Sequence, residues 1–150
     1  MGVIGMPADY YSTDFLCFKL GKVYRNVQRY YEYYLSKFGL TTVQFFVINI
    51  LVNQDGIRFK DLALALSIEG ATLTGLLDRM ERADLLRRSP DPDDRRSILI
   101  FLTSKGQEVG NQLKNLAVDL DSNIRNQFSV EDYKQFLLVL DNIVVPDQRI

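Results

Sequence analysis

Residues 76–106 read LLDRMERADLLRRSPDPDDRRSILIFLTSKG, and the spacing of the apolar residues changes within this stretch. Up to Ala83 they keep the three- and four-residue spacing of an amphipathic helix. Two runs with strand character follow, Leu85–Ser89 and Ser97–Leu102, and a charged segment rich in Pro and Asp separates them. The stretch therefore predicts a helix followed directly by a β-hairpin.

A second short helix precedes this one. Apolar spacing predicts helices over Phe59–Leu66 and from about Ala71 to Ala83, with a brief break at Ser67–Gly70. Two short helices joined by a tight, Gly-containing turn form a helix-turn-helix, and a hairpin directly behind it makes the unit a winged helix. In such a unit the second helix is the one that enters a DNA groove.

The segment before this unit is also predicted to be helical. Residues 12–37 form a long amphipathic helix that stops near Gly39, where glycine favours the left-handed conformation. Residues 43–52 form an apolar helix, and Thr41 with Gln44 three residues later forms its capping box.

Two further helices are predicted after the hairpin. The first is one long helix that starts at Thr103 or Ser104 and runs through Ile124. The second starts at Ser129 and ends before Pro146. The residues that this last helix is expected to bury are Tyr133, Phe136, Leu137, Leu140 and Val144.

The predicted fold class is mainly α with a small β-hairpin wing (α+β), a winged helix-turn-helix with long dimerisation helices at both ends. Residues 1–11 are predicted to be a flexible N-terminal arm, and residues 41–102 the winged helix-turn-helix DNA-binding lobe. Residues 12–40 and 103–145 together form a helical dimerisation region. This prediction rests on length, because a first helix of roughly 40 Å is too long for a small core alone.

Composition excludes several classes of protein. The 150 residues are 47% hydrophobic and 25% charged, which is typical of a globular domain, and no stretch is apolar enough for a membrane span. The chain has no histidine and one cysteine, so His-dependent catalysis, His-ligated zinc and an internal disulfide are excluded. We therefore expect no enzyme, no cofactor and no metal. The single cysteine and the lack of a basic residue before Lys19 favour a cytoplasmic protein without a secretory signal.

Basic residues are concentrated in the helix-turn-helix and the hairpin. The net charge of the chain is −1, yet six arginines fall between Arg79 and Arg96. One face of the predicted second helix lies opposite its apolar stripe and is suited to contact bases and phosphates. The candidate DNA-binding residues of this helix are Thr72, Thr74, Gly75, Arg79 and Arg82. Alone, such a face also fits a solvated helix surface.

At the hairpin tip the candidates are Asp94, Arg95 and Arg96, because a guanidinium fits a narrow minor groove. The alternative is a solvated cluster of ion pairs. The order of elements, the LLDRME, LLRR and DPDDRRS segments and the closing Leu102-Thr103 and Gly106 resemble the MarR (multiple antibiotic resistance regulator) family. The wing signature of that family, Asp-x-Arg-Ser, matches Asp94, Arg96 and Ser97.

This resemblance implies a homodimeric transcription factor, a repressor that binds a pseudo-palindromic operator in double-stranded DNA. It also implies that the aspartate and an arginine of the wing act as a pair, one bracing the loop and one reaching DNA. Because Arg95 and Arg96 are adjacent, the sequence leaves open which of them enters the groove. An alternative of another class is a helical protein-interaction module without DNA binding.

Two sensing modes are open. The Leu16-Cys17-Phe18 run resembles the organic-hydroperoxide-sensing branch of the family, in which a cysteine in this helix is oxidised. Tyrosines four and fourteen residues later support that thiolate, and here these positions are Gly21 and Tyr31. Because only one tyrosine is present, we favour the other mode, release by a small aromatic or phenolic effector. Its candidate contacts are Tyr24, Arg25, Tyr31 and Phe45, with Cys17 as the redox alternative.

Overall fold

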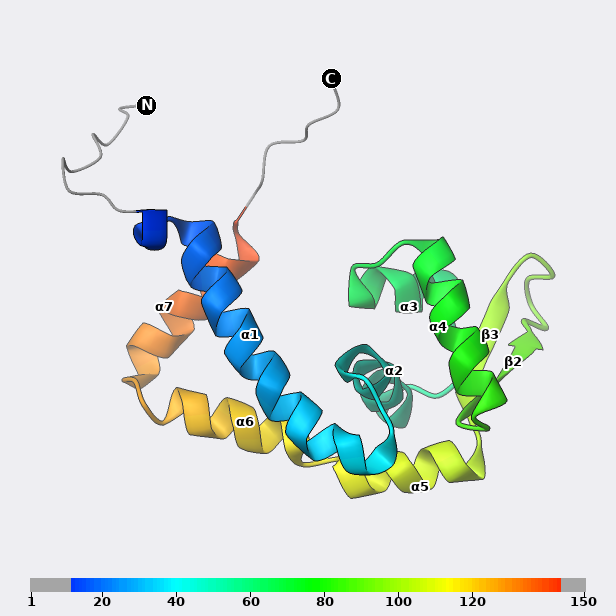
Figure 1. The fold of residues 1–150 in the computed structure, drawn as a ribbon. Helices are drawn as coiled ribbons and strands as arrows, with labels where there is room; N and C mark the ends of the chain where they lie inside the picture. Colours follow the sequence, from blue (N-terminus) through cyan, green and yellow to red (C-terminus); the bar gives the residue numbers. More distant parts are fainter. Residues whose placement is uncertain (1–11, 144–150) are drawn as a thin grey trace, which may run out of the picture. The chain divides into compact units, whose positions relative to one another are not determined.

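The computed structural model describes residues 12–143, so the predicted N-terminal arm lies outside the described residues, as does the end of the chain after residue 143. The chain forms two compact units, one up to Gly110 and one from Asn111 onwards. The first unit contains the helix-turn-helix and a three-stranded sheet (Figure 1). The predicted fold class, mainly α with a small β wing, is confirmed.

The core of the first unit is built around α2 (Thr42–Asn53), which is apolar on most faces. Its residues Phe45, Val47, Ile48 and Leu51 are all almost fully buried. The predicted capping box is present, since Thr41 Oγ1 accepts from the backbone N–H of Gln44 and the Gln44 side chain accepts from the backbone N–H of Thr41.

The first helix is shorter than predicted. A 3₁₀ turn (η1, Ser12–Asp14) precedes α1 (Leu16–Leu35), and a second 3₁₀ turn (η2, Ser36–Phe38) follows it. Gly39 then ends the segment with φ of 64°, as predicted, because this left-handed conformation carries no steric cost in glycine. Tyr31 and Leu35 are the residues that α1 buries.

The helix-turn-helix consists of α3 (Phe59–Leu66) and α4 (Gly70–Arg82), close to the predicted bounds. Ser67, rather than a glycine, takes the left-handed conformation that ends α3, with φ of 52°. The N–H of Ile68 donates to the carbonyl of Ala63 at 3.1 Å and closes the end of the helix. Asp84 ends α4 in the same way, with φ of 57°.

The sheet has three antiparallel strands in the order β1-β3-β2. The hairpin pairs β2 (Leu86–Pro90) with β3 (Ile98–Leu102), with Leu86 opposite Leu102 and Pro90 opposite Ile98. The sequence did not predict β1 (Ile57–Arg58), because two residues carry no detectable alternation. β1 pairs with the edge of β3 opposite to β2, and it lies between α2 and α3 in the chain.

The long helix predicted from Ser104 through Ile124 is wrong. The structure has two helices, α5 (Ser104–Leu113) and α6 (Leu116–Arg125), with a turn between them. Periodicity did not reveal the break because Leu113 and Leu116 are three residues apart, so the apolar spacing continues across the turn. The last helix, α7 (Val130–Asp141), starts at the predicted cap, where Ser129 Oγ accepts from the N–H of Asp132 at 3.1 Å.

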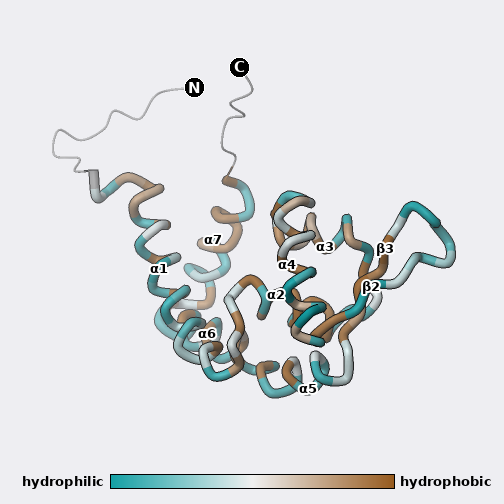
Figure 2. Tube along the Cα trace, turned by 45° about the vertical axis from the view of Figure 1, so that its right-hand side comes forward, coloured by the Kyte–Doolittle hydropathy of each residue, from teal (hydrophilic) through white to brown (hydrophobic). Residues whose placement is uncertain are grey.

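The expected burial of the last helix is also wrong. Phe136 and Leu137 are 48% and 42% exposed, and no residue of α7 is buried. In α1 the apolar stripe is exposed as well, with Leu16 and Val23 both more than half exposed. Figure 2 shows apolar colouring along α7, whereas the tip of the β2–β3 hairpin is hydrophilic. Both helices therefore carry exposed apolar side chains.

Within residues 12–143 no single helix is long and apolar enough to cross a membrane. The helices over Leu16–Phe38 and Thr42–Asn53 pass the length and composition criteria only as a pair, and they are bent by 76° relative to each other.

A close backbone contact joins the start of α5 to Leu85, in the short segment between α4 and β2. A Cβ added to Gly106 would lie 1.9 Å from the carbonyl oxygen of Leu85. The same carbonyl accepts from the N–H of Thr103 at 3.1 Å, and Lys105 Nζ donates to the carbonyl of Ala83 at 2.8 Å. Because both sides of the contact are backbone segments held by hydrogen bonds, neither can move away without loss of those bonds.

We expect Gly106→Ala to destabilise the protein by about 1–3 kcal/mol or more, since the methyl group overlaps backbone atoms. The control is Gly75→Ala within α4, where the added Cβ approaches only the flexible end of Arg79, at 3.8 Å. That control should gain about 0.5–1 kcal/mol from lower backbone entropy in the unfolded chain. Thermal unfolding at one protein concentration measures both. Equal midpoints for Gly106→Ala and the parent would contradict the contact.

Candidate nucleic-acid interface

Helix α4 divides into a buried face and an exposed face. Leu73, Leu76, Leu77 and Met80 are at most 5% exposed and anchor the helix on the core. The opposite side presents the predicted residues Thr72, Thr74, Arg79 and Arg82, all exposed, with Gly75 between them. The structure therefore gathers the predicted residues of this helix on one accessible surface.

Two of these side chains are held by the helix itself. The hydroxyl of Thr74 donates to the carbonyl of Gly70 at 2.9 Å, which leaves the oxygen as an acceptor toward solvent. Arg82 Nε donates to the carbonyl of Asp78 at 3.2 Å. The Arg82 guanidinium therefore lies near the C-terminal end of α4, where its positive charge interacts favourably with the negative end of the helix dipole.

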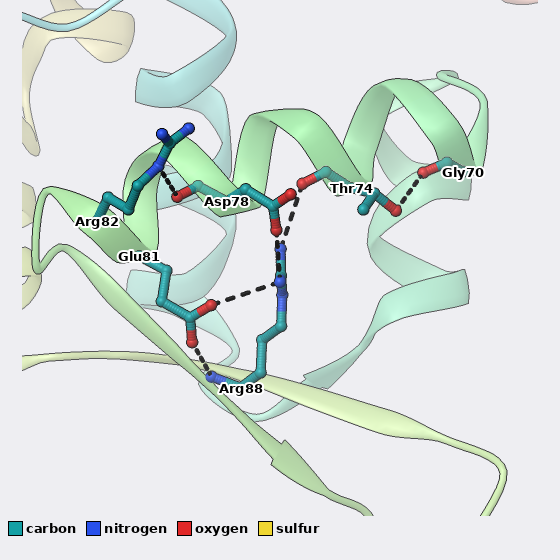
Figure 3. A network of polar contacts seen from close by, with 6 residues as sticks. All are labelled: Gly70, Thr74, Asp78, Glu81, Arg82 and Arg88. Carbon is teal, nitrogen blue, oxygen red and sulfur yellow. Dashed lines mark hydrogen bonds and ion pairs between the residues drawn. The ribbon is translucent and has the colours of Figure 1, made fainter.

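Arg88 on β2 joins the wing to α4 (Figure 3). Its Nη1 lies 2.7 Å from Asp78 Oδ1 and 3.4 Å from Glu81 Oε2, and its Nη2 donates to the carbonyl of Thr74 at 3.3 Å. The backbone N–H of Arg88 also donates to Glu81 Oε1, at 3.2 Å. With its side chain 24% exposed, Arg88 is shielded enough for these charge-assisted bonds to hold the two elements together.

The hairpin tip is shaped by Asp94. Its carboxylate accepts from the N–H of Arg96 at 3.0 Å and from the hydroxyl of Ser97 at 2.9 Å. The wing aspartate therefore braces the loop through the backbone and a hydroxyl, not through an ion pair with an arginine side chain. The resemblance implied that one member of the wing pair braces the loop, and within the described residues Asp94 makes contacts of that kind.

Asp91 fastens the base of the loop to β1. This carboxylate is 4% exposed, accepts from the N–H of Asp93 at 2.9 Å and pairs with Arg58 Nε at 2.9 Å. The hydrogen bond from Asp93 is the main cause that lowers the pKa of Asp91, burial acts in the opposite direction, and the bond from Arg58 lowers it further. The same pairing raises the pKa of Arg58. Asp91 is thus held ionised at neutral pH.

Arg95 and Arg96 are exposed at the tip, and neither guanidinium forms a salt bridge with any residue in the described part of the chain. Their charges are therefore available to an external anion. Arg87, in contrast, lies over the ring of Phe101 at 4.5 Å from its centroid, which holds it on the face of the hairpin.

Sequence reasoning missed Arg58 and Arg88. Both are charged residues in or beside short strands, and a charged residue in a sequence is normally assigned to solvent. The alternation of β2 offered a weak signal, since Leu86 and Arg88 share a face of that strand. Nothing in the sequence near Arg58 indicated a partner 33 residues away.

The structure gathers the proposed sensing residues only in part. Tyr31 is 5% exposed and packs on Phe45, with ring centroids 5.4 Å apart. Tyr24 and Cys17 are exposed on earlier turns of α1, and Tyr24 accepts a hydrogen bond from Gln28. Arg25 is exposed on that helix as well. Tyr31 and Phe45 thus belong to the core of the first unit, whereas the others lie on its surface.

The geometry of this unit is shared with known regulators. A model of the MarR family matches residues 40–98. The HTH-type transcriptional regulator MgrA of Staphylococcus aureus is 31% identical over 130 residues, which is 86% of this chain and 87% of MgrA.

Two solved structures of relatives contain DNA. The complex of S. aureus MepR with DNA has a TM-score of 0.78 and 25% identity, over 85% of this chain and 94% of MepR. The structure of reduced AbfR bound to DNA has a TM-score of 0.63 and 26% identity, over 85% of this chain and 93% of AbfR. The helix-turn-helix with its braced wing, the match of residues 40–98 and the identity to MgrA over most of both chains lead to one conclusion: this chain belongs to the MarR family of DNA-binding transcriptional regulators.

Proposed function

We propose that the protein is an operator-binding repressor that inserts α4 into the major groove and the β2–β3 hairpin into the adjacent minor groove. The observation that carries this proposal is the Arg88 network, which holds the exposed face of α4 and the arginine-bearing hairpin as one rigid body. Because the helix and the hairpin are already held together, contacting both grooves costs little further conformational entropy for ordering one relative to the other.

The roles of the residues follow from their positions. Thr72 and Thr74 near the start of α4 face the bases, where threonine contacts a base edge or a thymine methyl. Arg79 and Arg82 lie further along the same face and are suited to phosphates. Gly75 offers no side chain, so this part of the helix can approach the base edges closely.

At the tip, Arg95 and Arg96 are the candidates for the minor groove, and Asp94 keeps the loop in the shape that presents them. Arg95→Ala or Arg96→Ala should weaken operator binding by about 1–3 kcal/mol without changing the thermal midpoint. The variant with the larger loss identifies the arginine that enters the groove. Fluorescence anisotropy with an operator selected from a random-sequence pool measures the effect.

The control for these variants is Lys37→Ala, which removes one positive charge from η2, outside the helix-turn-helix and the wing. Binding by both arginine variants with the parent affinity at ~150 mM salt, near physiological ionic strength, would contradict a role for the wing in affinity.

We also propose that the functional unit is a homodimer, formed by the terminal helices. The support is the exposed apolar surface on three of them, which a stable monomer rarely presents. Its members on α1, α6 and α7 include Leu16, Val23, Val118, Phe136, Leu138 and Val139. A two-fold axis would place two copies of α4 about one helical turn of DNA apart, which matches a pseudo-palindromic operator.

Sedimentation equilibrium should therefore find a dimer at micromolar concentration. Phe136→Lys should shift the protein toward monomer, because a charge at this position is solvated in the single chain and unpaired in the interface. Leu64→Lys on α3, at a residue that is 79% exposed, is the matched control and should remain dimeric. A stable monomer of the parent protein would overturn the proposed architecture.

We propose that a small aromatic effector releases the operator. The support is the aromatic surface of α1, where the rings of Tyr30 and Tyr34 lie 4.8 Å apart and Tyr33 is 68% exposed. Such a ligand acts only if it binds the released conformation more tightly than the bound one. The alternative is oxidation of Cys17, which is exposed, and DNA binding by AbfR in its reduced form favours that alternative.

An organic hydroperoxide distinguishes the two modes. We expect the parent and Cys17→Ser to stay equally bound to the operator, because Gly21 lacks the hydroxyl that supports a thiolate in the redox branch. Release of the parent together with retention by Cys17→Ser would instead identify oxidation as the switch, since serine cannot form a sulfenic acid. Anisotropy before and after peroxide, with reversal by dithiothreitol, gives the readout.

A further inference from the structure

A basic cleft lies beside the wing, where Arg96 and Ser97 of the wing signature meet Arg58, Phe59 and Lys60, which belong neither to that signature nor to the recognition helix. The cleft has a volume of about 230 Å³ and lies between the start of α3 and the beginning of β3. Its lining residues are Arg58, Phe59, Lys60, Arg96, Ser97 and Ile98. Three of the six carry a positive charge, and none carries a negative one.

Arg58 separates this cleft from an acidic hollow. The hollow is lined by Asp61, Asp91 and Asp93 among others, and Arg58 lines both sites. Arg58 Nε donates a hydrogen bond to Asp91 Oδ2, and the negative charges of Asp61 and Asp94 also raise the pKa of Arg58. The ion pair with Asp91 fixes the guanidinium at the border, while its side chain stays 51% exposed. Lys60 and Arg96 are exposed and form no salt bridge among the described residues.

The backbone at this place also favours an anion. Arg58 is the N-cap residue of α3, with an extended backbone, and no side chain caps the first N–H groups of the helix. The partial positive charge of a helix N-terminus adds to that of Arg58 and Lys60. The helix end is not the basis of the site, because three cationic side chains line the cleft independently of it.

The sheet order decides which part of a DNA duplex would meet this cleft. The strands run β1-β3-β2, and Arg88 joins α4 to β2, so β1 and the start of α3 lie at the other edge of the sheet. If α4 enters the major groove and the hairpin tip enters the minor groove, as proposed, the β1 edge would lie on the side of the wing away from the Arg88 contact with α4. The DNA backbone that it would then meet is the one that borders the minor groove on that side.

We propose that the cleft of Arg58, Lys60 and Arg96 is a phosphodiester-binding site for the DNA strand that borders the minor groove on the β1 side. The inference rests on the proposed insertion of the wing and adds the ligand class and the residues of a second contact. Lys60 supplies a mobile charge, and Arg58 supplies a guanidinium that Asp91 holds in place. This contact positions the wing and reads no sequence.

The test uses the full chain and a duplex operator selected from a random-sequence pool. Binding is measured over roughly 50–200 mM salt for the parent, Lys60→Ala and the charge-matched control Lys37→Ala. Lys60→Ala should weaken binding several-fold and reduce the log–log salt slope by about one, with the same sequence preference. Lys37→Ala should keep the parent slope.

Single methylphosphonate substitutions in the duplex then locate the contact. The neutral linkage on the β1 side of the minor groove should weaken DNA binding by the parent. It should leave DNA binding by Lys60→Ala unchanged, because that variant already lacks the ion pair between Lys60 and the phosphate. A parent slope in Lys60→Ala, or equal losses at every linkage for both proteins, overturns the site. Arg95→Ala and Arg96→Ala separate the two proposals, because Arg95 lies outside the cleft: if either variant loses affinity while Lys60→Ala does not, only the phosphate site fails, and if none of the three variants loses affinity, wing insertion fails too.

Discussion

The ionic network around Arg88 is the interaction on which the proposed DNA-binding surface depends. Arg88 comes from β2, and its partners Thr74, Asp78 and Glu81 occupy successive turns of α4. A hydrophobic contact alone would allow the strand and the helix to slide, whereas a guanidinium with several fixed acceptors permits only one arrangement. The exposed face of α4 and the hairpin thus keep one mutual orientation before any DNA is present.

The wing itself is a second constraint, made by two aspartates with different partners. Asp94 folds the tip by accepting from the backbone of Arg96 and the hydroxyl of Ser97. Asp91 fastens the base of the loop to Arg58 on β1. Both use their charges inside the loop, which leaves Arg95 and Arg96 as the cations that the tip presents to solvent. An acidic sequence at the tip is therefore compatible with an anion-binding wing.

The terminal helices differ from the core helices in the exposure of their apolar residues. The first unit buries its core around α2, and the close contact of Gly106 with the Leu85 carbonyl ties the start of α5 to that unit. In α1 and α7 the apolar residues stay exposed in the single chain. Exposed apolar faces of this kind favour a partner that covers them, and they are the observation that supports the proposed second copy.

The sequence by itself determined the order and type of nearly all elements, because helix and strand periods are local properties of the chain. It also determined the exposed face of α4, the Thr41–Gln44 cap and the turn at Gly39. Only the tertiary structure decided the break between Leu113 and Leu116, strand β1 and the exposure of the α7 stripe. It also decided the partners of Arg58 and Arg88, which lie 33 and 10 residues from Asp91 and Asp78. Local spacing contains no information on such pairs, because their energy depends on distances that exist only once the chain has packed.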